Sequence, residues 1–150
     1  MKDNEFANSI QEILDMRDNQ PERFNAILNL QLIDCSREEG YIDFGFKVEE
    51  WCLNPYGGIH GGAICSLLDT GMGVGAVAIS QKFVSTADLS VSFLKAMTSD
   101  YYIIRVEYNH IGRRMIRVTG KVLSDAGSDI CATAMGSFVI TESRAKGLQD

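Results

Sequence analysis

Basic residues are scarce in this chain. Its 150 residues include 14 Lys and Arg against 20 Asp and Glu, so the formal net charge is −6. Nucleic acids and anionic membrane surfaces require a basic face on their partners. We therefore expect neither a nucleic acid nor a membrane to be the main partner. A small anionic ligand held by a local basic cluster is still compatible with this charge.

The sequence shows no metal-site spacing, and we expect neither a leader sequence nor a membrane span. The four cysteines form no CxxC pair and lie far in sequence from His60 and His110, so the sequence predicts no metal site. The first ten residues are too polar for a signal peptide. The longest apolar run, 63–79, is interrupted by polar residues and glycines, which makes it a poor membrane span. We expect a cytoplasmic protein in which Cys65 and Cys131 are buried free thiols.

The spacing of apolar residues predicts an α+β domain. Helical spacing marks residues 4–17, Pro21 can begin a second short helix, and a long, almost wholly apolar helix is predicted at 61–78. Alternating apolar residues predict strands within the segments 40–50, 88–93, 101–109, 113–123 and 128–141.

Strands that follow one another after a helix favour antiparallel pairing. We expect an antiparallel sheet that curls around the 61–78 helix in a single 1–150 domain. Residues 1–28 would form an N-terminal helical extension, and the polar tail at 142–150 should be frayed.

The stretch NPYGGIHGGAICSLLD, residues 54–69, is the least ordinary part of the chain. Glycines flank His60 just before the predicted helix, and they let the backbone turn tightly and a ligand approach closely. If the helix begins near Gly61, its first N–H groups have no partner within the helix, and the helix dipole adds positive potential there. Such a helix end is suited to bind an anion, or the oxyanion that develops on a thioester or ester carbonyl.

Asp69 is the one carboxylate in the apolar run. A buried carboxylate costs several kcal/mol unless it is paired or needed, so Asp69 is a candidate for chemistry. Nine residues of helix rotate the chain by about 900°, so His60 and Asp69 point to opposite sides and cannot share a substrate within one chain. If both serve one site, one of them must come from a second subunit across a two-fold axis. Taken singly, glycines predict only a turn, and a lone His or Asp is usually structural; their combination favours a functional site.

The same residues resemble a known family. The string Asn54-x-x-Gly57-x-x-His60-Gly61-Gly62, followed by Leu68-Asp69 and Gly73, resembles the hotdog-fold acyl-CoA thioesterases of the PaaI-like, phenylacetate-degradation type. The segment STADLSVSFLKA, residues 85–96, resembles the strand that follows the central helix in that family. The resemblance implies a hotdog fold, in which a five- or six-stranded antiparallel sheet wraps around the 61–78 helix. It also implies a homodimer with a continuous sheet and active sites at its interface, and we expect two such dimers to pair.

The resemblance further implies the reaction and the roles of its residues. The reaction is hydrolysis of an acyl-CoA thioester to a carboxylic acid and coenzyme A, with no separate cofactor. The N–H of Gly61 would polarise the thioester carbonyl, while Asn54 and His60 position the thioester or the water. Asp69 of the other subunit would act as general base or nucleophile, and Thr86 would assist the water.

Several neighbouring residues are candidate substrate contacts. Gly62 adjoins the oxyanion site, and Ser85 would replace Thr86 if the alignment slipped by one residue. Four further side chains are candidates to line an acyl pocket but fit the core equally well: Phe83, Phe93, Met97 and Tyr101.

Coenzyme A carries phosphates, and the acidic chain offers few places for them. Arg113 and Arg114, which follow the Gly112 turn, are the candidate phosphate ligands. Arg117 and Lys121 on the following strand either join this cluster or belong to a solvated face of the sheet.

Two other functions share part of this pattern. A hotdog hydratase or dehydratase also places a histidine and a carboxylate across a helix, but the residues around its motif differ from this string. A non-catalytic acyl-CoA-binding sensor would keep the ligand cradle and lose the carboxylate. The presence of Asp69 therefore favours an enzyme.

Overall fold

The chain begins with short helical segments. The computed structural model describes residues 3–125 and 129–141, and the predicted tail at 142–150 lies outside them. Helix α1 (Asn4–Asp15) starts at Asp3, whose side chain accepts a hydrogen bond from the N–H of Phe6. A 3-10 turn (Met16–Asn19) and helix α2 (Phe24–Leu28) follow. Both predicted N-terminal helices are therefore confirmed, but α2 begins at Phe24 and not at Pro21.

Six strands form one antiparallel sheet in the order β1-β2-β4-β5-β6-β3. Their bounds are β1 (Gln31–Ser36), β2 (Tyr41–Lys47), β3 (Val84–Phe93), β4 (Tyr101–Ile111), β5 (Met115–Ser124) and β6 (Ile130–Ile140). Each of the five predicted strands is present. The sheet has two edges, β1 and β3. Strand β3 lies at an edge because β4, the next strand in the chain, pairs with β2 and β5, and among the described strands only β6 pairs with β3.

Strand β1 is the element that the sequence pattern does not predict. Its pairing with β2 shifts between Leu32 and Asp34, so an extra residue, Ile33, interrupts the alternation. Cys35 and Ser36 are then buried one after the other, although a regular strand would alternate. Helix α1, which is not part of the sheet, also contacts β1 and covers part of the strand.

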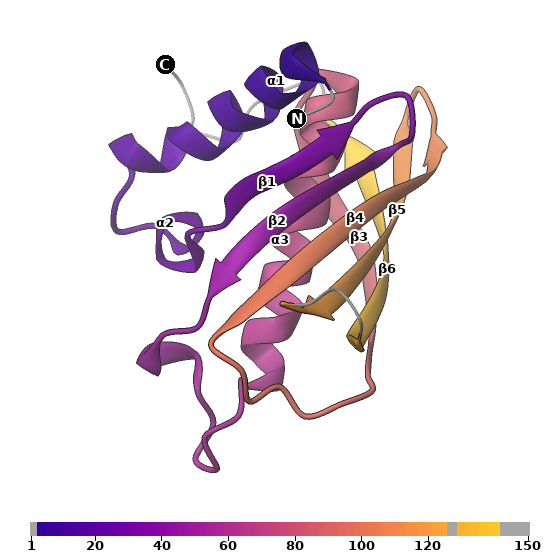
Figure 1. The fold of residues 1–150 in the computed structure, drawn as a ribbon. Coiled ribbons are helices and arrows are strands. Elements are labelled where there is room, and N and C mark those ends of the chain that lie inside the picture. The colour runs from indigo at the N-terminus through magenta and orange to yellow at the C-terminus, as the bar shows by residue number, and fades with distance from the viewer. Residues whose placement is uncertain (1–2, 126–128, 142–150) are drawn as a thin grey trace.

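Helix α3 (Gly61–Ser80) runs along the inner face of the sheet, which curves around it (Figure 1). It confirms the helix predicted at 61–78 and ends at Gln81, whose φ of 57° is left-handed. Its other side is contacted by α1 and α2. Apolar residues all round the helix are explained by this enclosure from both sides.

By length and composition α3 alone, among the helices of the described residues, would suffice to cross a membrane. This differs from the expectation that its polar interruptions disqualify it. Its most apolar window has a mean hydropathy of 1.6 and is 56% buried within the fold. Here the helix serves as the core helix, because the sheet and the N-terminal helices cover its apolar surface.

Two glycines bring α3 close to the sheet. A Cβ at Gly71 would lie 3.4 Å from the side chains of Ile104 and Phe44. Gly75 accepts a 2.5 Å hydrogen bond from the hydroxyl of Tyr108 through its carbonyl oxygen. These contacts fix the rotation of the helix. Because Asp69 lies about 200° around the helix from Gly71, it is turned away from the middle strands of the sheet.

Candidate active site

Asp69 on α3 faces Thr86 on the edge strand β3. The Thr86 hydroxyl donates a 2.7 Å hydrogen bond to Oδ1 of Asp69. The bond fixes one carboxylate oxygen, while Oδ2 makes no hydrogen bond to the described residues. Ser85, the alternative to Thr86, extends from the opposite face of the strand, because successive side chains alternate. The structure therefore selects Thr86 as the partner of Asp69.

The environment of Asp69 differs from the sequence prediction. Its apolar neighbours suggested a buried carboxylate, but Asp69 is half-buried and Thr86 is exposed. The physical reason is the position of β3 at the sheet edge, where no strand of the described residues lies beyond it. The polar side of α3 opens toward this edge.

Asn54 shapes the loop before α3. Its Oδ1 accepts hydrogen bonds from the N–H groups of Tyr56, at 2.9 Å, and Gly58, at 3.2 Å. The loop closes further when the N–H of Asn54 donates to the carbonyl of Gly58, and Gly57 takes a φ of 88°, which favours glycine. Asn54 thus holds the loop that carries His60, and its amide NH₂ is left for other partners.

His60 is the N-cap of α3. Its Nδ1 accepts a 2.8 Å hydrogen bond from the N–H of Gly62, and its own N–H donates to the carbonyl of Cys52. The neutral ring therefore carries its proton on Nε2, and this exposed donor is available to a substrate. The N–H of Gly62 is already engaged. The N–H of Gly61 makes no hydrogen bond within the described residues, so it is a free donor at this helix end.

A cavity of about 380 Å³ lies at the start of α3. Its walls include four residues singled out in the sequence: Asn54, Gly61, Phe93 and Met97. A Cβ at Gly61 would lie 3.6 Å from the Phe93 ring, so the cavity joins the start of α3 to the end of β3. Tyr101 does not line it, because its ring lies over Gly45 of β2.

One chain does not bring all the predicted site residues together. Gly61 lies beside Phe93 at one end of β3, whereas Asp69 is bonded to Thr86 near the other end. Thr86 and Phe93 are seven positions apart on the strand, a span of about 23 Å. A single thioester group cannot contact both places, which agrees with the half-turn argument from the sequence.

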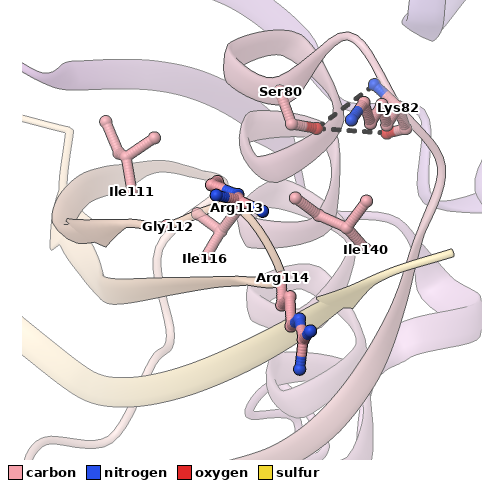
Figure 2. A pocket seen from close by; sticks show the side chains of 8 residues that line it. All are labelled: Ser80, Lys82, Ile111, Gly112, Arg113, Arg114, Ile116 and Ile140. Carbon is pink, nitrogen blue, oxygen red and sulfur yellow. Dashed lines mark hydrogen bonds between the residues drawn. The ribbon is translucent and has the colours of Figure 1, made fainter.

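A basic pocket of about 380 Å³ lies beyond the C-terminal end of α3 (Figure 2). Arg113 and Arg114 line it, as does Lys82, which the sequence analysis missed because 31 residues separate it from Arg113. No carboxylate occurs among the described residues that line this pocket. Lys121 lies elsewhere and forms a 2.8 Å ion pair with Glu107, so it belongs to the outer face of the sheet.

The cysteines are free thiols, and the pKa of two of them is raised. Burial, reinforced by Asp3 and Asp34, raises the pKa of Cys35 to about 11. Burial also raises the pKa of the Cys131 thiol. Cys65 is half-buried rather than buried as expected, because it lies on the side of α3 that the sheet leaves partly open. Within 3–125 and 129–141, no three His, Cys, Asp or Glu side chains gather as a metal site requires.

Solved structures with this arrangement of strands and helices are numerous. Zebrafish thioesterase superfamily member 2 matches with a TM-score of 0.78 at 18% identity, over 89% of this chain and 97% of that one. A hypothetical thioesterase from Streptococcus pneumoniae, solved with coenzyme A, matches with a TM-score of 0.72 at 24% identity, over 87% and 99%. A phenylacetic acid degradation-related thioesterase from Ralstonia eutropha matches with a TM-score of 0.72 at 22% identity, over 83% and 98%. At these identities the likeness establishes the fold.

Sequence comparison gives the family. No curated protein matches the chain. The family model of the thioesterase superfamily matches residues 56–131, which include the His60 loop, α3, β3 and the β4–β5 turn with Arg113 and Arg114. The chain therefore belongs to the thioesterase superfamily, and it is an enzyme with the hotdog fold.

Proposed function

We propose that this protein hydrolyses an acyl-CoA thioester to a carboxylic acid and coenzyme A. The hydrogen bond from Thr86 to Asp69 carries the proposal, because it positions a carboxylate with one free oxygen beside a sheet edge. Superfamily membership supports the thioester. Coenzyme A is supported by the two streptococcal relatives, one solved with coenzyme A and one with acetyl-CoA. The Ralstonia relative supports the phenylacetate-degradation type as the subgroup.

In the proposed reaction Asp69 acts as a general base. Its free Oδ2 takes a proton from water, and the water oxygen forms a bond to the thioester carbon. The carbonyl oxygen becomes an oxyanion, which the N–H of Gly61 at the positive end of α3 stabilises. The carbon–sulfur bond then breaks, and the sulfur leaves as the thiolate of coenzyme A, which takes up the proton that Asp69 accepted from water. His60 Nε2–H and the Asn54 amide orient the substrate beside Gly61.

The proposed site needs two chains. Within residues 3–125 and 129–141, strand β3 pairs only with β6. Most of its residues are exposed, and Asp88 is its single charge. A long edge strand with so little charge is a surface for pairing with another strand. Antiparallel pairing of two β3 strands about their middle would bring the Gly61 and Phe93 end of one copy to Asp69 and Thr86 of the other. A homodimer with a continuous sheet therefore completes the site.

The basic pocket is the proposed place for the phosphates of coenzyme A. Lys82, Arg113 and Arg114 form no ion pair within the described residues, although the chain is acidic overall. Guanidinium groups bind phosphate oxygens through paired hydrogen bonds, and the lysine adds a point charge. Unpaired cations in one hollow favour an anionic ligand over a role in solubility.

Release of free thiol from acyl-CoA substrates tests the proposal. We expect turnover of at least one member of a panel that runs from acetyl-CoA to decanoyl-CoA and includes phenylacetyl-CoA. Asp69→Asn should lower kcat by about 10²-fold or more, the range that a positioned acid–base group supplies. Asp100→Asn, the same change at an exposed aspartate, is the matched control. Hydration of enoyl-CoA without thiol release, or full activity of Asp69→Asn, would contradict the proposal.

A further inference from the structure

The N-terminal extension encloses a cavity against α3. Its volume is about 680 Å³, larger than the cavity at Gly61 or the basic pocket, and within the range of small-molecule sites. Its apolar lining side chains come from both layers: Ile13, Leu14 and Phe24 from the extension, and Val74, Val77 and Phe83 from α3 and the residues after it. Polar and charged side chains of the extension also line the cavity: Glu12, Arg17, Gln20, Arg23 and Asn25. The reaction proposed above assigns no role to this space.

The cavity adjoins the proposed catalytic pair. Thr70, which follows Asp69 on α3, lines it, and so does Phe83, which lies three residues before Thr86. The hydrogen bond between Asp69 and Thr86 thus joins the two elements that form the inner wall of the cavity. Asp69 and Thr86 do not line the cavity themselves, but a substrate whose carbonyl carbon lies at Asp69 is one residue of α3 away from the cavity wall.

The connection between α3 and β3 separates apolar from basic surroundings. Gln81 and Phe83 line the apolar cavity, whereas Lys82 between them lines the basic pocket. One short segment therefore separates a cavity with many apolar side chains from a pocket whose charged lining residues are all cationic. A ligand with a hydrocarbon part and an anionic part matches this division.

The outer wall is less tightly packed than the inner wall. Helix α2 has five residues and buries only Leu28, and its Phe24 is 53% exposed although it lines the cavity. The other end of the extension is anchored, because Phe6, Ile10 and Leu14 of α1 are buried. Arg17 also fixes the turn after α1 by donating a 2.5 Å hydrogen bond to the carbonyl of Leu30. The wall near α2 therefore has room to admit a chain without disturbing α1.

We propose that this cavity receives an aliphatic acyl chain of medium length, and that the extension thereby determines chain-length preference. The inference rests on the proposed acyl-CoA substrate and adds the class of its acyl group. Most of the apolar side chains that line the cavity are aliphatic, and such side chains can enclose a flexible chain along its length. Each methylene that enters should raise kcat/KM by about 4-fold until the cavity is full.

Filling the cavity from each wall tests the inference. The measured quantity is the ratio of kcat/KM for decanoyl-CoA to that for butyryl-CoA. Ile13→Trp from α1 and Val77→Phe from α3 should each lower this ratio by about 10-fold or more, since the added ring occupies the space of several methylenes. Ile33→Trp is the control, because Ile33 is exposed on β1 and lies outside the cavity. It should leave the ratio unchanged.

Binding distinguishes this inference from the proposed reaction. Calorimetry of the Asp69→Asn protein should show decanoyl-CoA binding at least 10-fold more tightly than coenzyme A, with the difference lost when Ile13→Trp is added. If the wild-type protein hydrolyses no acyl-CoA but this difference is found, the reaction fails and the cavity stands. If it hydrolyses acyl-CoA and both filling variants keep the wild-type ratio, the cavity assignment is overturned and the reaction stands. A preference for phenylacetyl-CoA that the filling variants leave intact would also overturn it.

Discussion

The helix–strand unit of α3 and β3 carries different functional groups at its two ends. At the start of α3, a loop held by Asn54 and a cap formed by His60 leave the N–H of Gly61 free beside Phe93. Near the start of β3, a hydroxyl and a carboxylate meet through the bond between Thr86 and Asp69. The first end supplies donors and the second supplies a base, so neither is a complete hydrolytic site.

The separation follows from helix geometry. Free N–H groups exist only in the first turn of a helix. A base in the same helix must lie further along, at a position whose side chain reaches a neighbouring element. Asp69 satisfies this by reaching β3, but it is then about 12 Å along the axis from Gly61. An antiparallel copy resolves the conflict, because it places the donor end of one helix beside the base of the other.

Mixing two inactive proteins gives the largest expected effect. His60→Ala lacks the donor end and Asp69→Asn lacks the base. After subunit exchange by brief unfolding and refolding, about half of the dimers are mixed, and each mixed dimer has one intact site of two. Thiol release should rise from near zero to about a quarter of the wild-type rate, if each site takes one end from each chain. No recovery, with exchange confirmed by mass spectrometry, would place both ends in one chain.

The next effect separates Thr86 from its neighbour. Thr86→Val removes the hydroxyl that fixes Asp69 and should lower kcat by about 10-fold or more, which is the value of one hydrogen bond to a charged group. Thr86→Ser should keep most of the activity. Ser85→Ala serves as the control, because Ser85 does not contact Asp69. Equal losses in Thr86→Val and Ser85→Ala would show a general effect on β3 rather than a positioned carboxylate.

The basic pocket should affect binding more than chemistry. Lys82→Ala should raise KM for acyl-CoA by about 5-fold with little change in kcat, because the lysine would contact phosphates far from the thioester. The increase should shrink at high salt. Lys47→Ala, at an exposed lysine on β2, provides the comparison. A fall in kcat at constant KM would assign Lys82 to the reacting end.

The smallest effect concerns the role of Asn54. Asn54→Ala removes an acceptor of two N–H groups and should lower the free energy of unfolding by about 1–2 kcal/mol. Asn54→Asp retains the acceptor, so thermal denaturation should show most of this loss restored. Asn54→Asp keeps the acceptor that holds the loop but lacks the amide NH₂. A loss of kcat that remains in Asn54→Asp therefore measures the contribution of the NH₂ group to catalysis.

Part of the site was predictable because it is local. The N–H donors follow from a helix that begins at Gly61, and the opposition of His60 and Asp69 follows from the helical repeat. The choice between Thr86 and Ser85 was not local, since it depends on which face of β3 meets α3. Lys82 was missed for a similar reason: only the packing of the β4–β5 turn against the end of α3 brings it to Arg113 and Arg114.

The sequence by itself determined α3, the strands with regular alternation, and the impossibility of using His60 and Asp69 together in one chain. These properties depend on the repeat of the backbone, which short stretches of residues encode. Tertiary structure alone decided the sixth strand, the half-exposed position of Asp69 and the cavity under the N-terminal extension. The bulge in β1 interrupts the alternation by which a strand is recognised in sequence. The exposure of Asp69 and the cavity both depend on which surfaces of α3 the rest of the chain covers. Residues distant in sequence make that decision, so no local pattern can express it.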